Sequence, residues 1–293
     1  AVGLRIWVKE LELPATIKVM LDAVREDNVL PGGEEFVLAL DEWRHERSLG
    51  VGLYYKWDPP APREWMLRRR EWFAFVRQVL THSRTKDSVA HVAEAIDAGE
   101  MDDGGLLRRW REIEPTFVPN SVPVWVDDTA LEYARGWLEQ TKGLVWVGHA
   151  AFGRRLSELS GVPFFSRNAA TEAGMHISEW RGESAILSYQ CRTGLNLQDR
   201  WSRNLAIVPP PTGEWAEQFI GRTHRKGQDE DEVTVEFLLS SRRTYFTLAQ
   251  CVRDARMDES SHGQPRKLSY ANAEWGPVAP LIEQLDRDTE IGA

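Results

Sequence analysis

The sequence has little cysteine, and its two cysteines are not spaced for a disulfide framework. Cys191 and Cys251 lie far apart among the 293 residues, and no Cys-x-x-Cys pair occurs. This pattern argues against a disulfide scaffold and against a cysteine zinc site. The simplest compartment for such a chain is a reducing cytosol.

Long apolar runs and an excess of positive charge are also absent. No apolar stretch approaches the roughly 20 residues needed to span a bilayer, and the opening AVGLRIWVKELELP is interrupted by charges too often for a signal sequence. The net charge of −9 argues against a protein that coats nucleic acid with a basic surface. We therefore expect a folded, soluble protein in which any binding of nucleic acid is local.

Several catalytic motifs are missing as well. The seven histidines form no His-x-x-x-His or His-Glu-x-x-His pair, so we expect no metal site. No Gly-x-x-x-x-Gly-Lys-Ser/Thr loop occurs, so a recognisable cradle for phosphates is lacking. Asp41 and Glu42 follow an apolar run in the manner of a Mg-binding Asp-Glu box. The sequence pattern of that region predicts a helix, however, and the competing interpretation is that Asp41 and Glu42 lie on its solvated face.

The chain divides by pattern into three parts. Residues 1–117 read mainly as helices, with apolar residues three and four apart and arginines between them, and they predict a helical subdomain. Residues 118–258 alternate short apolar strands with helices, which predicts an α/β domain with a parallel sheet covered by helices. Residues 259–293 are polar and predict a loose tail.

The segment EQFIGRTHRKGQ concentrates guanidinium groups in a short stretch of predicted helix. In a helix that begins near Thr212, Gln218, Arg222 and Arg225 fall at i, i+4 and i+7 on one face. Gly221 beside that face leaves room for a close approach. Two forked cations one turn apart suit bidentate contacts with phosphate oxygens. The competing interpretation is a helix-end device, in which cations of the last turn, before a stop at Gly227, favour the helix dipole.

The surrounding sequence resembles the second RecA-like domain of superfamily 2 helicases and translocases, especially the Swi/Snf-like branch and phage-type DEAD/DEAH-box relatives. In that family a strand ending in Ser or Thr leads to a glycine loop with an Asn-Leu pair, and then to a helix with Gln-x-x-Gly-Arg-x-x-Arg. The matching positions are Ser188, Thr193, Gly194, Asn196, Leu197, Gln218, Gly221, Arg222 and Arg225. The resemblance covers roughly residues 120–245 and implies a RecA-like fold.

The resemblance also implies a function for these residues. Arg225 would be the arginine finger and Arg222 its neighbour, both catalytic in ATP hydrolysis with Mg²⁺. Gln218, Gly194, Asn196 and Gly221 would lie at the nucleotide cleft. Ser188, Gln190, Arg192 and Thr193 would lie near the nucleic-acid backbone, although a solvent-exposed role for Arg192 is equally open. The track would be DNA, with RNA as the other possibility.

Because no phosphate loop is present, we expect this chain alone to be inactive. A first RecA-like lobe, in cis or in trans, would bring the phosphate loop and the Asp-Glu box. The leading hypothesis is therefore the C-terminal lobe of an ATP-dependent helicase or translocase, cytoplasmic in a bacterial or phage-infected cell. A non-hydrolytic module that binds nucleic acid or a partner is the second hypothesis, and a generic α/β enzyme with an anion site is the third.

Overall fold

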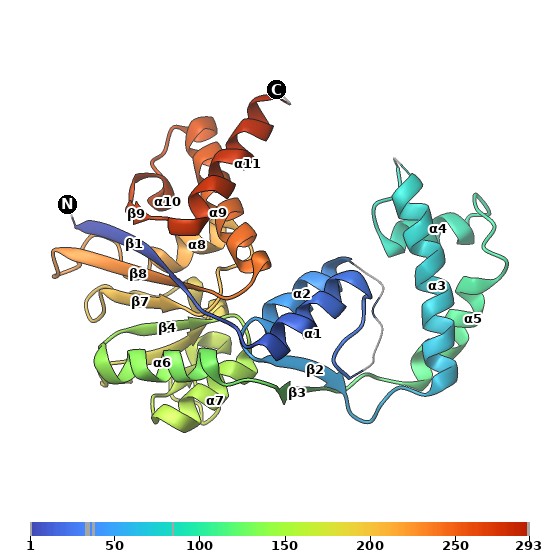
Figure 1. Ribbon diagram of the computed structural model, residues 1–293, viewed down its shortest axis with the longest axis horizontal. Helices are drawn as coiled ribbons and strands as arrows, with labels where there is room; N and C mark the ends of the chain where they lie inside the picture. Colours follow the sequence, from blue (N-terminus) through green and yellow to red (C-terminus); the bar gives the residue numbers. More distant parts are fainter. Residues whose placement is uncertain (1, 33–35, 37–38, 84, 292–293) are drawn as a thin grey trace. The chain divides into compact units, whose positions relative to one another are not determined.

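The computed structural model describes residues 2–32, 36, 39–83 and 85–291, which form two compact units (Figure 1). We call them the sheet unit, Ala1–Ile17, Gly50–Gly52 and Val126–Ala293, and the helical unit, Lys18–Leu49 and Leu53–Trp125. Among the helices of these described residues, none is long and apolar enough to cross a membrane.

A parallel sheet organises the sheet unit. Over the described residues it has seven strands in the order β5-β6-β4-β7-β8-β1-β9, and every neighbouring pair is parallel. The strands are β1 (Gly3–Glu10), β4 (Leu144–Val147), β5 (Phe164–Phe165), β6 (Ala185–Ser188), β7 (Arg203–Ala206), β8 (Glu232–Leu239) and β9 (Asn272–Glu274). All four residues of β4, LVWV, are buried, as is typical of a central strand covered on both faces. The predicted α/β class with a parallel sheet covered by helices is confirmed.

Helices cover both faces of this sheet. They are α6 (Thr129–Gln140), α7 (Ala150–Ser160), α8 (Gly213–Ile220), α9 (Arg242–His262), α10 (Lys267–Tyr270) and α11 (Ala279–Ile291). Trp146 of β4, Phe219 of α8 and Phe237 of β8 share one buried core. Since successive side chains of a strand point to opposite faces, Glu236 points away from that core, where it accepts a hydrogen bond from the Tyr133 hydroxyl of α6. Burial and this bond raise the pKa of Tyr133.

The helical unit packs around aromatic side chains. Its elements are most of α1 (Ala15–Glu26), then α2 (Ala39–Leu49), β2 (Leu53–Trp57), α3 (Arg63–His82), α4 (Val89–Asp97), α5 (Leu106–Ile113) and β3 (Ser121–Trp125), with β2 and β3 antiparallel. Trp65 and Trp110 are buried with ring centroids 5.1 Å apart, and Trp72 lies in the same cluster. Ser88 is the N-cap of α4, and its side chain accepts a hydrogen bond from His91 N.

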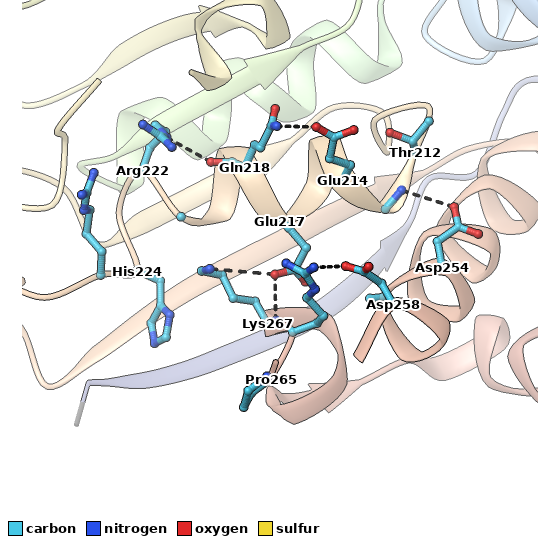
Figure 2. A pocket seen from close by; sticks show the side chains of 15 residues that line it. Thr212, Glu214, Glu217, Gln218, Arg222, His224, Asp254, Asp258, Pro265 and Lys267 are labelled. Atoms are coloured by element: carbon cyan, nitrogen blue, oxygen red, sulfur yellow. Dashed lines mark hydrogen bonds and ion pairs between the residues drawn. The ribbon is translucent and has the colours of Figure 1, made fainter. Parts of the chain in front are cut away.

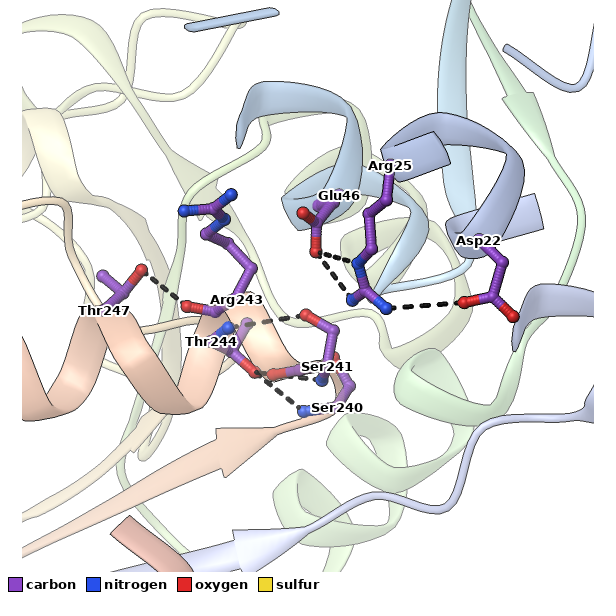
Figure 3. Close-up of polar contacts among 8 residues, drawn as sticks. All are labelled: Asp22, Arg25, Glu46, Ser240, Ser241, Arg243, Thr244 and Thr247. Atoms are coloured by element: carbon purple, nitrogen blue, oxygen red, sulfur yellow. Dashed lines mark hydrogen bonds and ion pairs between the residues drawn. The ribbon is translucent and has the colours of Figure 1, made fainter. Parts of the chain in front are cut away.

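Local polar contacts fix helices within each unit (Figure 3). In the helical unit, Arg25 donates from Nη2 and Nε to Glu46 Oε2, at 2.7 and 3.0 Å, and the Glu46 side chain is only 3% exposed. In the sheet unit, Ser241 accepts from Thr244 N at 3.4 Å and begins α9 with a capping box. Each contact gives a buried polar atom a partner, which removes the penalty of an unmade hydrogen bond.

The acidic pair that resembles a Mg-binding box lies on a helix. Asp41 and Glu42 occupy the first turn of α2, where carboxylates favour the helix dipole. Asp41 Oδ1 lies 3.7 Å from Arg44 Nη1, one turn further along. This placement follows the helical interpretation of the segment, in which the two acids are ordinary first-turn residues.

The boundaries expected at residues 117 and 258 differ from the observed division. The first strand, β1, belongs to the sheet unit because it pairs with β8 from Gly3↔Glu232 to Glu10↔Leu239. The polar residues after 258 include α10, β9 and α11, and Leu268, Val278 and Ile282 are buried in the core of the sheet unit. Contacts that are distant in sequence decide both differences, since the pairing of β1 with β8 and the burial of Leu268, Val278 and Ile282 join the ends of the chain to the sheet.

Two glycines within helices of the sheet unit provide a matched test of how closely α7 packs against β5. A Cβ built on Gly153 of α7 would lie 2.5 Å from the buried ring of Phe164, whereas one on Gly136 of α6 would meet nothing within 4 Å. Gly153→Ala is therefore expected to lower the free energy of unfolding by about 1–3 kcal/mol, because the new methyl group would force the buried Phe164 ring or the backbone to shift. Gly136→Ala should raise it by about 0.5–1 kcal/mol, because alanine favours a helix. Chemical denaturation checks both, and a stabilised Gly153→Ala would contradict the close approach of α7 to β5.

Candidate functional site

The helix that precedes the two candidate arginines is shorter than predicted. The Thr212 side chain accepts from Trp215 N and starts α8, which ends at Ile220 with Gly221 as its C-cap. Residues 222–228, which we call the arginine segment, leave the helix in turns. The expectation that Gln218, Arg222 and Arg225 share one helical face is therefore wrong.

This early end bears on the helix-end interpretation of the arginines. The last turn of α8 contains no basic residue, and Arg225 lies five positions beyond Ile220. The favourable term between a cation and a helix dipole falls off within the last turn, so it gives little reason for an arginine at this position. Gly227, expected to stop the helix, instead adopts φ +93° inside the arginine segment.

A second loop holds the arginine segment by direct hydrogen bonds. We call residues 193–197, between η3 (Tyr189–Arg192) and β7, the glycine loop. Arg225 Nη1 donates to Asn196 Oδ1 at 2.7 Å, and Arg222 Nη1 donates to Leu195 O at 2.8 Å. Leu197 N donates in return to Arg222 O at 3.1 Å. The structure thus brings Arg222, Arg225 and Asn196 together.

The two arginines lie in different surroundings. Arg222 is half-buried and also donates from Nε to Gln218 O at 3.1 Å, so backbone carbonyls occupy two edges of its fork. Burial lowers the pKa of Arg222, and the neighbouring charge of Arg225 lowers it further. Arg225 is exposed, and Asn196 holds one of its nitrogens. Arg225 is therefore the better placed of the two to meet an incoming anion.

A buried amide ties the arginine segment to the sheet. Asn204 of β7 accepts from Trp146 Nε1 at 3.1 Å and donates to Thr223 Oγ1 at 3.0 Å and to Thr234 O at 3.1 Å. Asn204 is 1% exposed, and Thr223 is fully buried. Because Thr223 directly follows Arg222, this contact fixes the point from which both arginine side chains extend.

The residues expected near a nucleic-acid backbone follow the end of β6. Ser188 accepts from Gln190 N at 3.2 Å and caps η3, and Gln190 and Thr193 are exposed. Arg192 is half-buried, since its guanidinium lies 3.4 Å from the ring centroid of Trp215 and donates to Tyr189 O. Burial lowers the pKa of Arg192. Because it stacks on Trp215, the Arg192 side chain is not fully exposed to solvent.

The remaining candidates lie along α8 and the glycine loop. Gln218 Nε2 donates to Glu214 Oε1 at 2.7 Å. The side-chain oxygen of Gln218, Oε1, is buried. Gly194 adopts φ +76°, and a Cβ there would meet nothing within 4 Å. The glycine is therefore needed for its backbone conformation, not to make space. At Gly221 a Cβ would lie 3.0 Å from Glu217 O, which is closer than an ordinary packing distance, and 3.5 Å from Lys267 Cε.

An open hollow of about 900 Å³ lies beside the arginine segment (Figure 2). Glu214, Gln218 and Arg222 line it from α8 and the arginine segment, with Lys267 and Asp258 across from them. Glu217 closes its floor by accepting from the backbone N–H groups of residues 267 and 268, each at 2.8 Å. The acidic side chains here have partners within the fold, since Glu214 accepts from Gln218, Asp254 accepts from Gln250 and Asp258 pairs with Arg266.

Sequence reasoning missed several residues that build this site. Asn204 and Thr223 were not singled out, although an asparagine inside the apolar run RNLAIV is a recognisable signal, because a buried amide needs partners. Trp215 and Glu217 had no such signal. Their partners, Arg192 and the backbone of α10, are remote in sequence, and only the fold reveals them.

Comparisons with known proteins give distant likenesses. The sequence matches no family model and no curated protein. Among solved structures, it is similar to the C-terminal part of the Fun30 ATPase domain, at 12% identity and a TM-score of 0.43, covering 99% of this chain and 98% of that one. It is also similar to the Mycobacterium smegmatis helicase Lhr bound to ssDNA and AMP-PNP, at 12% identity and a TM-score of 0.32, over 46% of this chain and 19% of that one.

A third likeness is to the Pyrococcus furiosus Hef helicase domain, at 12% identity and a TM-score of 0.35, over 89% of this chain and 58% of that one. All three TM-scores lie below 0.5.

The buried amide gives a direct test of how the arginine segment is held. Asn204→Leu keeps roughly the volume but leaves Trp146 Nε1 without its acceptor and Thr223 Oγ1 with only its 3.4 Å bond to Ile220 O, so the free energy of unfolding should fall by about 1–3 kcal/mol. Asn196→Ala, an exposed change that frees Arg225, should stay within about 0.5 kcal/mol of the original protein. Denaturant unfolding compares the two. Equal effects would contradict the anchoring role of Asn204.

Proposed function

We propose that this chain is the C-terminal, RecA-like motor lobe of an ATP-dependent helicase or translocase of superfamily 2, of the Swi/Snf-like branch with phage-type relatives. The lobe supplies arginines to ATP hydrolysis and contacts to a nucleic-acid backbone. The proposed setting is the cytoplasm of a bacterial or phage-infected cell, and the proposed track is DNA, with RNA as the alternative.

One observation supports this proposal above the others, namely the hydrogen bond from Arg225 to Asn196. It joins the Gln-x-x-Gly-Arg-x-x-Arg motif to the glycine loop, two segments separated by β7 and α8 in the sequence. The guanidinium of Arg225 is exposed, while its neighbour Arg222 is fixed by carbonyl oxygens. In the proposed motor, Arg225 stabilises charge on the transferring phosphoryl, and Arg222 positions the segment.

The nucleotide would be held mainly by a partner lobe. ATP with Mg²⁺ requires a phosphate loop and carboxylate ligands, and the sequence has no Gly-x-x-x-x-Gly-Lys-Ser/Thr. Among the described residues, no group of three or more His, Cys, Asp or Glu side chains is placed to hold a metal ion. We therefore assign the phosphate loop and the Mg²⁺ ligands to a first lobe, in cis or in trans. Gln218, Gly194, Asn196 and Gly221 would line the cleft from this side.

A non-hydrolytic binding module is the second candidate, and one observation favours it. Arg222 and Arg192 both make their hydrogen bonds within the fold, as structural arginines do. A module that keeps the motor fold would need these hydrogen bonds of Arg222 and Arg192. It would not need the planar guanidinium of Arg225. The two candidates therefore differ in what a change at Arg225 does to catalysis.

The test is the substitution Arg225→Lys in the complete motor, with its first lobe supplied. Lysine keeps the charge but lacks the planar fork, so folding should be almost unchanged while ATP turnover falls by about 10³–10⁵, on the order of a lost arginine finger. ATP binding should weaken much less than turnover. Steady-state hydrolysis and nucleotide titration measure the two effects.

The matched control is Lys226→Ala, which removes the adjacent exposed charge and should leave turnover near normal. If Arg225→Lys also hydrolyses ATP at close to the original rate while Arg225→Ala lowers the melting temperature, Arg225 serves the fold. The motor proposal would then lose its main support.

A further inference from the structure

A strained turn follows β5 in the sheet unit. In η2 (Arg167–Ala169), Asn168 has φ +58° and Ala169 has φ +54°, two consecutive residues other than glycine in the left-handed region. Asparagine tolerates this region, but alanine does so at a cost of about 1 kcal/mol or more. Such a conformation persists where the surroundings fix it, and it is more common at functional sites than elsewhere.

The surroundings of this turn do fix it. Ala169 is 6% exposed and belongs to the core of the sheet unit, and its carbonyl accepts from Ile177 N at 2.9 Å. Cys191 Sγ donates to Ser166 O at 2.9 Å, which joins the turn to η3 after β6. Burial raises the pKa of Cys191 to about 11, so the thiol keeps the proton that it donates. The turn is thus held in place by the element that bears Gln190 and Arg192.

This anchoring leaves a cation and an amide facing solvent. Arg167 and Asn168 are exposed, while the next residue, Ala169, is buried. Strands β5 and β6 are parallel neighbours, so the turns that follow them lie at the same edge of the sheet. Exposed Gln190 and Thr193 follow β6 at that edge.

The comparison with Arg192 explains why a second cation matters. The Arg192 guanidinium stacks on Trp215 and donates to Tyr189 O, so part of its hydrogen-bonding capacity is used within the fold. Arg167 lies on the adjoining turn, and this residue is exposed to solvent. A phosphate that approaches this edge would meet Arg167 without first displacing a contact of the fold.

We propose that Arg167 and Asn168 form a backbone-contacting turn, in which the guanidinium of Arg167 pairs with a phosphate of the nucleic-acid track. The strained backbone points both side chains outward beside Gln190 and Thr193. This inference rests on the proposed function, because it needs a nucleic-acid track, and it names residues outside the motifs that suggested that function. The contact is independent of base sequence, since a phosphate carries no sequence information.

The experiment measures binding of fluorescein-labelled duplex DNA by the purified chain, by anisotropy over a series of salt concentrations. Arg167→Gln should weaken binding by about 2- to 12-fold, on the order of one hydrogen bond. It should also reduce the slope of log affinity against log salt by about 1, because one phosphate contact is lost. Arg167→Lys should restore most of the affinity, since a phosphate contact needs a cation.

The matched control is Arg203→Gln, which removes an exposed arginine at the start of β7, and hence at the opposite edge of the parallel sheet. It should leave affinity and salt slope unchanged. Melting temperatures of all variants verify that each is folded, which is expected because both side chains are exposed.

The outcomes separate this inference from the proposed function. If the original chain binds DNA and Arg167→Gln binds equally well, the turn is no contact, while the motor proposal stands. Equal losses in Arg167→Gln and Arg203→Gln would indicate a general effect of charge and would also overturn the inference. If the original chain binds neither duplex DNA nor RNA, the nucleic-acid part of the proposed function fails, and this inference fails with it.

Discussion

The buried amide of Asn204 is the constraint on which the site depends. It accepts from Trp146 in the centre of the sheet and donates to Thr223 in the arginine segment. A buried amide must satisfy its donors and acceptors within the protein, so this contact is costly to break. The arginine segment leaves its helix early and has no regular structure of its own. Its position is therefore set by the sheet as well as by α8, whose last carbonyls still accept from Arg222, Thr223 and His224.

From this anchor the two arginines acquire different environments. Arg222 is turned into the fold and holds the glycine loop through Leu195 O, whereas Arg225 remains exposed and touches the same loop through Asn196. A motif with two arginines at fixed spacing thus combines one structural contact with one presented charge. In the proposed motor, this arrangement lets a change at the glycine loop move the presented guanidinium. Nucleotide chemistry and contacts to the track would then be coupled through hydrogen bonds of the fold.

Patterns within a few residues predicted much of this fold. The alternation of short apolar strands with helices over residues 118–258 predicted a parallel sheet covered by helices, and the apolar runs LVWV and VTVEFLL form β4 and β8 of that sheet. Long-range contacts could not be predicted in the same way. The strand β1 gains its place by pairing with β8, and the polar residues after 258 gain theirs by burying Leu268 against the core. At the site, the sequence pattern did not reveal that α8 ends at Ile220 and that turns follow it.

The central claim is that this chain is one lobe of a two-lobe ATPase, and ATP turnover by the purified chain tests it most directly. With no phosphate loop in its sequence, the chain should show only background hydrolysis, with or without DNA. Turnover stimulated by DNA should appear once a first lobe with a phosphate loop is supplied. Hydrolysis by the chain alone, stimulated by DNA and abolished by Arg225→Ala, would contradict the account and would make Asp41 and Glu42 candidates for a true Mg-binding box.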